Sequence, residues 1–140
     1  MNTLVIDASV WVSAADATDS LSEVSRGFLS EVAAREFSIA LPESAQLEIA
    51  CALARRLRNA EQGRGLTERM LGSPLVTTHA LSRTMLREAI HVATGSFLRS
   101  ADAPYAALAG RLDADLVTWN EELIRRTPGL TPRDWMKRHQ

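Results

Sequence analysis

The stretch Thr3-Leu4-Val5-Ile6-Asp7-Ala8-Ser9 decides the fold that the sequence predicts. Residues 3–6 are apolar or β-branched, which is typical of a strand buried inside a parallel sheet. Asp7 follows directly, so we expect its carboxylate at the carboxyl end of that strand. A strand of this kind needs parallel neighbours and a helical layer on each face.

The rest of the chain supplies both. Short apolar runs predict three further strands, at residues 37–41, 74–78 and 116–118. Helical patterns fill the segments between them, at residues 9–17, 21–34, 42 to about 59, 66–71, 82 to about 97, 101–112 and 121–126. Gln62-Gly63-Arg64-Gly65 predicts a break, and an edge strand is expected near Trp135. Alternation of strands and helices implies right-handed crossovers. The predicted fold class is therefore α/β: a three-layer α/β/α sandwich with a central, mainly parallel sheet, as a single domain over residues 1–140.

Composition places the chain among ordinary folded proteins. It has 140 residues, of which 46% are hydrophobic and 24% charged. No apolar run approaches the roughly 18–20 residues that span a membrane, and the first residues lack the basic and apolar regions of a signal peptide. The single cysteine, Cys51, forms no internal disulfide. These features predict a cytoplasmic protein with no membrane association.

The charge pattern gives no direct sign of nucleic-acid binding. The net charge is −1, so no global basic field is expected. Lys137 is the only lysine, and the remaining cations are arginines, which suit bidentate contact with phosphate. Two groups of basic residues stand close together in the sequence, one from Arg55 to Arg64 and one from Arg125 to Arg138. Each group is either a solvated helix face or a phosphate-binding patch.

Four polar residues stand in apolar surroundings. Asp7 and Asn120 each follow a predicted strand, and each would also cap the next helix well. Asp102 stands just before Pro104, where a helix cap is again the alternative. Glu48 is the one polar residue in residues 47–54, a helix segment apolar nearly all round and therefore expected to be largely buried. It is either a buried carboxylate with a compensating partner or the position that meets water.

Taken together, the acids predict a metal site. Asp7, Glu48 and Asp102 would meet at the edge of the sheet where ligands collect. Oxygen-only ligands suit Mg²⁺ or Mn²⁺, and the mutual repulsion of three carboxylates calls for a cation. The histidines show no paired spacing, so zinc is not expected. Asp115, at the opposite end of its strand, is expected at the surface.

At these residues the sequence resembles the PIN-domain family, and especially its VapC-type toxin ribonucleases. The most specific matches are Val5-Ile6-Asp7-Ala8-Ser9 and the pairing of residues 102–109 with Leu116-Val117-Thr118. Residues 42–53, with Glu48 inside them, fit the second acidic position of the family. The resemblance implies divalent-metal-dependent cleavage of RNA, frequent homodimers and a small antitoxin that blocks the acidic pocket. The expected function is a metal-dependent endoribonuclease, the toxin of a type II toxin–antitoxin system.

The resemblance also assigns roles. Asp7, Glu48 and Asp102 match the first three acids of the site, and Thr118 matches the supporting hydroxyl. The fourth acid falls on Asn120, which offers an oxygen but one negative charge less. Our hypothesis is that Asp7 and Asp102 hold the metal, with Glu48 as a further ligand or as the base that orients water. Thr118 and Asn120 would act from outside the ligand set, while arginines from Arg55 onward would hold the RNA backbone.

Other functions fit the residues less well. A receiver-type phosphoacceptor needs an acidic pair after the first strand and a lysine near the site. A haloacid-dehalogenase-type phosphatase needs a second aspartate where Ser9 stands, and a dinucleotide-binding domain needs a glycine-rich turn after the first strand. The serious alternative is a PIN-like domain, weak or inactive in catalysis, that binds RNA or protein. Asn120 is the feature that supports it.

Overall fold

The computed structural model describes residues 2–140 and contains one parallel sheet. Its strands are β1 (Thr3–Ile6), β2 (Ser38–Pro42), β3 (Val76–His79) and β4 (Asp115–Val117), in the order β3-β2-β1-β4. The central strand β1 pairs Leu4 with Ile39 on one side and with Asp115 on the other. Asp7 therefore lies at the carboxyl end of β1, between β2 and β4, as its place after the first strand predicts.

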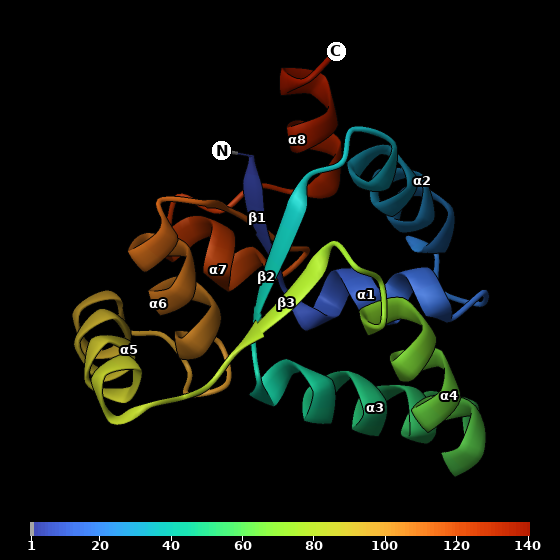
Figure 1. Ribbon diagram of the computed structural model, residues 1–140, viewed down its shortest axis with the longest axis horizontal. Helices are drawn as coiled ribbons and strands as arrows, with labels where there is room; N and C mark the ends of the chain where they lie inside the picture. Colours follow the sequence, from blue (N-terminus) through green and yellow to red (C-terminus); the bar gives the residue numbers. More distant parts are fainter. Residues whose placement is uncertain (1) are drawn as a thin grey trace.

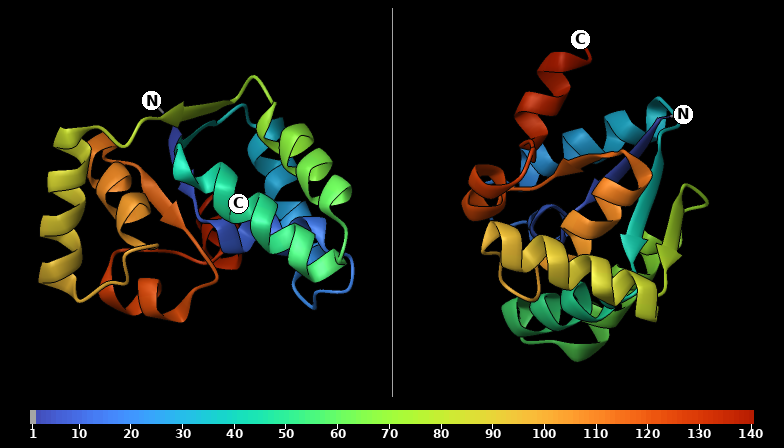
Figure 2. Two further views of the ribbon diagram at one scale, coloured as in Figure 1. Left: turned by 90° about the horizontal axis from the view of Figure 1, so that it is seen from below. Right: turned by 90° about the vertical axis from the view of Figure 1, so that its left-hand side faces the viewer.

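Helices cover both faces of this sheet (Figure 1). They are α1 (Ala8–Ala15), α2 (Ser22–Ala34), α3 (Ser44–Leu57), α4 (Ala60–Leu71), α5 (Arg83–Ser96), α6 (Ala103–Leu112), α7 (Glu121–Arg126) and α8 (Pro132–Arg138). Helix α6 packs on β1, β2 and β4, and α5 packs on α6. Helices α1, α2 and α8 lie on the opposite side of the sheet (Figure 2). The predicted three-layer α/β/α sandwich is confirmed.

The predicted break at the glycines is wrong, because α4 runs through both of them. Its amino end is capped by Asn59, whose side chain accepts a hydrogen bond from the backbone N–H of Gln62. Gly63 is buried against α3, and a Cβ atom there would lie 2.8 Å from the backbone nitrogen of Ala54. This glycine allows two helices to approach closely, and their packing outweighs its low helix propensity.

The predicted edge strand near Trp135 is also wrong. Thr131 caps α8 and Pro132 occupies its first turn, both of which favour a helix. The extra pairing at the sheet edge occurs earlier, as a single parallel bridge between Val117 and Leu130. Trp135 is instead fully buried and makes edge-to-face contacts with Phe28 and Phe37. Helix α8 thus belongs to the hydrophobic core.

Helix α3 lies at the carboxyl end of the sheet, below the strands in Figure 1. It begins at Ser44, so Pro42 ends β2 instead of starting the helix as predicted. The expectation that the segment around Glu48 is largely buried is wrong, since Leu47 is 69% exposed. One face of α3 packs inward, and Cys51 is exposed on the other side of the same segment.

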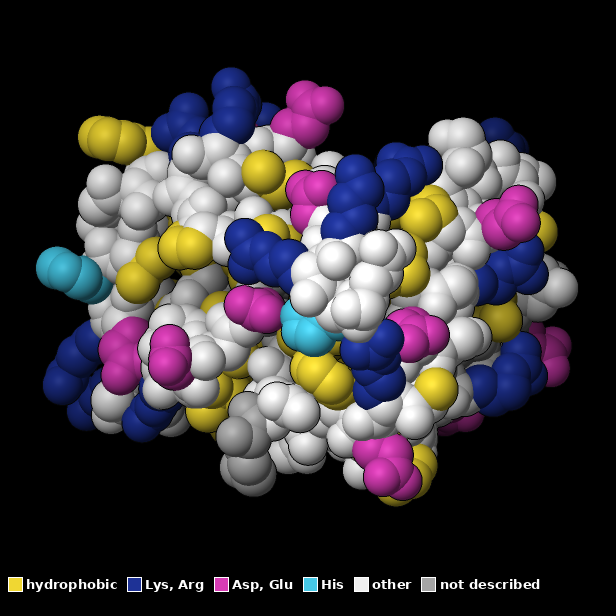
Figure 3. All heavy atoms as spheres, turned by 90° about the horizontal axis from the view of Figure 1, so that it is seen from above, with side chains coloured by type: hydrophobic (Ala, Val, Ile, Leu, Met, Phe, Trp, Pro, Cys, Tyr) yellow, Lys and Arg dark blue, Asp and Glu magenta, His cyan; other side chains and the backbone are white. Residues whose placement is uncertain are grey.

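The surface shows no extended region of a single charge on the face that carries α8. Basic and acidic side chains are interspersed there (Figure 3), in keeping with the net charge of −1. Asp115 is exposed, as predicted. No helix within residues 2–140 has the length and apolar character needed to cross a membrane.

Candidate active site

Asp7 is held in place by three hydrogen bonds. It caps α1 with an extended backbone, and its side chain is only 5% exposed. One carboxylate oxygen, Oδ2, accepts three hydrogen bonds: from Ser9 N (3.3 Å), Ser9 Oγ (2.7 Å) and Thr118 Oγ1 (2.8 Å). Its other oxygen, Oδ1, has no hydrogen-bond donor within residues 2–140. Asp7 therefore serves as a helix cap through one oxygen and leaves the other available for a ligand.

Thr118 joins two sides of the site. It is fully buried just after β4, donates to Asp7, and accepts a hydrogen bond from the backbone N–H of Asn120 at 2.9 Å. Ser9 acts in parallel, since its hydroxyl donates to Asp7 and accepts from the backbone N–H of Trp119 at 3.0 Å. Because both hydroxyls have their acceptors satisfied by backbone, their protons point at the carboxylate. The orientation of Asp7 is fixed from two elements at once.

Asp102 is placed at the start of α6 but does not cap it. Its side chain makes no capping hydrogen bond, and it is 8% exposed. Burial raises the pKa of Asp102, and the nearby charges of Asp7 and Glu122 raise it further, while Arg99 and a hydrogen bond from Asn120 oppose the shift. The Asp102 carboxylate is therefore buried at the N-cap position of α6 without bonding the helix backbone, and its donor is the side-chain amide of Asn120, at 3.4 and 3.5 Å.

Glu48 enters the site from the second turn of α3. Its Oε1 accepts a hydrogen bond from the hydroxyl of Tyr105 at 3.0 Å. Burial raises the pKa of Glu48, the Tyr105 hydrogen bond lowers it, and the charges of Asp7 and Asp102 raise it again. Burial likewise raises the pKa of Tyr105, so its hydroxyl stays protonated and remains a donor. The electrostatic influence of both aspartates on Glu48 places the three acids in one neighbourhood.

The donor chemistry of this neighbourhood fits a hard divalent cation. Asp7 and Asp102 bring negative charge to buried oxygens. Arg99, whose charge lowers the pKa of Asp102, is 80% exposed and lies 3.6 Å from Glu122. Within the part of the chain that the structure describes, no three acidic, histidine or cysteine side chains converge into a complete set of metal ligands. Mg²⁺ requires no such set, because it commonly keeps several waters and binds through one or two carboxylates. Asp7 and Asp102 can supply these.

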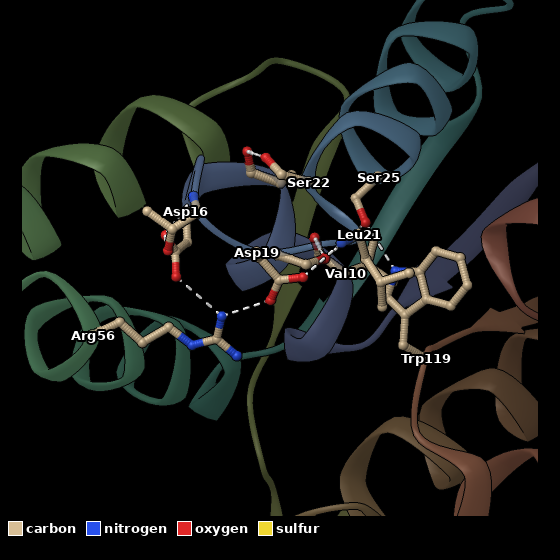
Figure 4. A network of polar contacts seen from close by, with 11 residues as sticks. Val10, Asp16, Asp19, Leu21, Ser22, Ser25, Arg56 and Trp119 are labelled. Carbon is tan, nitrogen blue, oxygen red and sulfur yellow. Dashed lines mark hydrogen bonds and ion pairs between the residues drawn. The ribbon is translucent and has the colours of Figure 1, made fainter.

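The arginines expected to hold RNA are only partly available. Arg56 donates to Asp16 at 3.2 Å and to Asp19 at 2.7 Å, which ties α3 to the turn between α1 and α2 (Figure 4). Arg55 is exposed but lies seven residues beyond Glu48, about 10 Å along the helix. The cation beside the acids is Arg99, which the sequence did not single out.

Trp119 has a structural role. Its indole N–H donates to the hydroxyl of Ser25 at 2.8 Å, so α2 and the segment after β4 are joined there (Figure 4). The guanidinium of Arg133 lies 5.3 Å from the centre of the ring. These contacts give Trp119 a packing role between α2 and the segment that follows β4.

Tyr105 and Ser9 are the other side chains that sequence reasoning missed. Tyr105 stands three residues after Asp102 on α6, a spacing that places two side chains on one face of a helix. Ser9 stands two residues after Asp7, where an aspartate cap commonly engages the following turn. Both spacings were visible in the sequence, but the link from Tyr105 to Glu48 spans 57 residues.

Comparison with known proteins identifies the family. The protein-family model described as "PIN domain" matches residues 4–130, so the chain belongs to the PIN domain family. Curated protein sequences give no match.

Solved structures share the fold at low sequence identity. PAE2754 from Pyrobaculum aerophilum is 19% identical with a TM-score of 0.74, over 98% of this chain and 88% of that one. VapBC2 from Rickettsia felis, bound to a DNA fragment from its promoter, is 16% identical with a TM-score of 0.70, over 92% and 96%. VapC20 from Mycobacterium tuberculosis, a sarcin-ricin loop cleaving toxin, is 13% identical with a TM-score of 0.67, over 81% and 86%.

Proposed function

We propose that this chain is a metal-dependent endoribonuclease and the toxin component of a type II toxin–antitoxin system. The observation that carries the proposal is the gathering of Asp7, Glu48 and Asp102 from three separate segments at the carboxyl edge of the sheet. Asp7 and Asp102 are linked through Thr118 and Asn120, and Glu48 accepts from Tyr105 of α6, the helix that begins after Asp102. Burial raises the pKa values of Glu48 and Asp102, and the charge of Asp7 raises both further. A cation bound beside these carboxylates would favour their charged forms and so offset their burial and mutual repulsion. The shared fold with VapC20, a sarcin-ricin loop cleaving toxin, supports the choice of substrate.

The residues divide the chemistry among them. When bound, Mg²⁺ or Mn²⁺ would supply a water of lowered pKa and would neutralise charge on the attacked phosphate. Asp7, through Oδ1, and Asp102 are the residues that would hold it. Glu48, whose pKa is raised by burial, is suited to accept a proton from the attacking water. Thr118 and Ser9 hold Asp7 in place. In-line attack of this water on phosphorus would form a P–O bond and break the P–O3′ bond. The leaving 3′ oxygen would take a proton from solvent, so that the products are a 5′-phosphate and a 3′-hydroxyl.

Protein partners are part of the proposal. From the resemblance to VapC-type toxins we propose a cognate antitoxin, a homodimer and a cytoplasmic location. The chain carries an open groove of about 710 Å³ along α5. Its lining includes four large apolar side chains that are each at least 42% exposed: Leu81, Leu86, Ile90 and Phe97. Apolar surface gathered in this way supports a chain that binds other proteins.

A second candidate function is a PIN-like domain that binds RNA or protein with weak or no catalysis. The specific observation in its favour is Asn120 at the usual fourth acidic position. The two functions differ in metal dependence, because a binding domain has no need of a divalent cation.

The test is cleavage of a total-RNA pool by the purified chain, free of antitoxin, with Mn²⁺ or Mg²⁺ and with EDTA. We expect discrete products that require the metal. Asp7→Asn should remove them, since the substituted side chain loses the charge that faces the metal while still capping α1. A matched control is Asp115→Asn, an exposed acid at the opposite end of β4, which should leave cleavage unchanged. Products that persist in EDTA or in Asp7→Asn would refute the mechanism.

A further inference from the structure

The side-chain oxygen of Asn120 is already fully used. Oδ1 accepts hydrogen bonds from the backbone N–H groups of Glu122 (2.9 Å) and Leu123 (3.4 Å), which caps the amino end of α7. An amide oxygen has two lone pairs, and both are occupied here. Asn120 therefore presents no free oxygen to the neighbouring acids.

The other end of the amide faces Asp102. Its Nδ2 lies 3.4 Å from Oδ2 and 3.5 Å from Oδ1 of that carboxylate. These are long hydrogen bonds, but the amide hydrogens are directed at the negative charge. The residue at the fourth position is thus a donor to the site and not a ligand within it.

The reverse orientation of the amide is excluded by its neighbours. Exchanging oxygen and nitrogen would place the NH₂ group against two backbone N–H donors of α7 and would turn the carbonyl oxygen toward the Asp102 carboxylate. Both contacts would then be repulsive. The hydrogen-bond network therefore assigns the orientation without ambiguity.

We propose that Asn120 is a positioning residue that takes the place of a fourth carboxylate, and that the site consequently binds a single divalent cation, which Asp7 and Asp102 would hold without an oxygen from Asn120. The inference rests on the proposed metal dependence. It follows because the Asn120 side offers an uncharged donor where a second cation would need an anionic oxygen.

Two matched substitutions test the role of Asn120. Asn120→Asp retains a good helix cap but replaces the donor that faces Asp102 by a carboxylate oxygen. Asn59→Asp makes the same change at the cap of α4, where the side chain accepts from the backbone N–H of Gln62 at 2.9 Å in an exposed position. Negative charge at a helix amino end is favourable in both variants. The new carboxylate at position 120 faces Asp102, with Glu121 and Glu122 in the first turn of α7, whereas the one at position 59 has only Glu61 in the first turn of α4 and is exposed.

The measurements are Mn²⁺ stoichiometry by titration calorimetry and melting temperature in EDTA. We expect one Mn²⁺ per wild-type chain. Asn120→Asp should melt at a lower temperature than wild type in EDTA and should bind Mn²⁺ about tenfold more tightly, the scale on which neighbours of metal ligands alter affinity. Asn59→Asp should show neither effect.

The outcomes separate the inference from the proposed function. Two Mn²⁺ per wild-type chain, or an Asn120→Asp variant that matches Asn59→Asp in both measurements, would overturn the inference and leave the nuclease proposal standing. No binding of Mn²⁺ by the folded wild-type chain would refute the metal site itself, and with it both proposals.

Discussion

Replacing Thr118 by valine removes one hydroxyl and almost no volume from the centre of the site. The hydroxyl is fully buried, donates to Asp7 Oδ2 at 2.8 Å, and accepts from the backbone N–H of Asn120 at 2.9 Å. The substitution thus deprives a nearly buried carboxylate of a donor and a backbone N–H of its acceptor. It leaves the packing around β4 largely unchanged.

The magnitude follows from these two contacts. A hydrogen bond to a charged group contributes about 1.5–3 kcal/mol, and an unsatisfied buried donor costs about 1–3 kcal/mol. Asn120 is half-buried as a residue, which places the cost of its unsatisfied N–H toward the lower end of that range, and the valine methyl gains about 0.8 kcal/mol from burial. We expect a net loss of about 2 kcal/mol in the free energy of unfolding. Because Asp7 would also lose one of its two orienting hydroxyls, Mn²⁺ affinity should fall by about tenfold.

Urea denaturation in EDTA measures the first effect, and Mn²⁺ titration measures the second. The control is Thr94→Val on the exposed side of α5, where the hydroxyl donates to the backbone carbonyl of Ile90 at 2.8 Å. This variant should stay within about 0.5 kcal/mol of wild type. If Thr118→Val loses no more stability than Thr94→Val, or binds Mn²⁺ as well as wild type, the reasoning about how Asp7 is held is refuted.

Two further predictions concern the elements that support the site. Gly63→Ala should lower the free energy of unfolding by about 1–3 kcal/mol, because its Cβ would lie 2.8 Å from the backbone of Ala54. In the control Gly65→Ala the new Cβ meets nothing nearer than 3.9 Å, so the free energy of unfolding should rise by up to about 1 kcal/mol. Equal urea midpoints for the two variants would contradict the close packing of α3 on α4. The Arg56 hydrogen bond lowers the pKa of Asp19 in the folded state. The pair therefore contributes to the free energy of unfolding above the unfolded pKa of Asp19, about 3.9, and this contribution is lost as the pH falls through the folded pKa. Arg56→Gln should therefore be less stable than wild type at pH 7, and the difference should shrink as the pH falls below about 4; a difference that stays constant would show that this pair does not titrate with folding.

The parts of the fold that follow from local sequence were predictable. The run of residues 3–6 identified the central strand. The place of Asp7 directly after that strand, and of Thr118 at the end of the strand predicted over residues 116–118, put both at the correct edge of the sheet, although β4 itself ends one residue earlier, at Val117. Helix α8 was missed because the aromatic Trp135 suggested a strand, although Thr131 and Pro132 carry ordinary signals of a helix start.

Contacts between distant segments were not predictable. The pairing of Tyr105 with Glu48 depends on how α6 and α3 meet, and no local pattern encodes it. Gly63 is a second example. Its low helix propensity predicts a break, but the residue is explained by the close packing of α4 on α3, which local sequence does not reveal. The direction in which the Asn120 amide points depends likewise on α7 and on Asp102.

The exposed Cys51 has a practical consequence for spectroscopy. It is the single thiol of the chain, and it stands three residues after Glu48 on α3, within about 5–6 Å from Cβ to Cβ on neighbouring faces of the helix. A nitroxide attached there needs no other cysteine to be removed. Dipolar broadening of its signal by Mn²⁺ would report occupancy beside Glu48 directly, in a chain that keeps every acid and hydroxyl of its natural sequence.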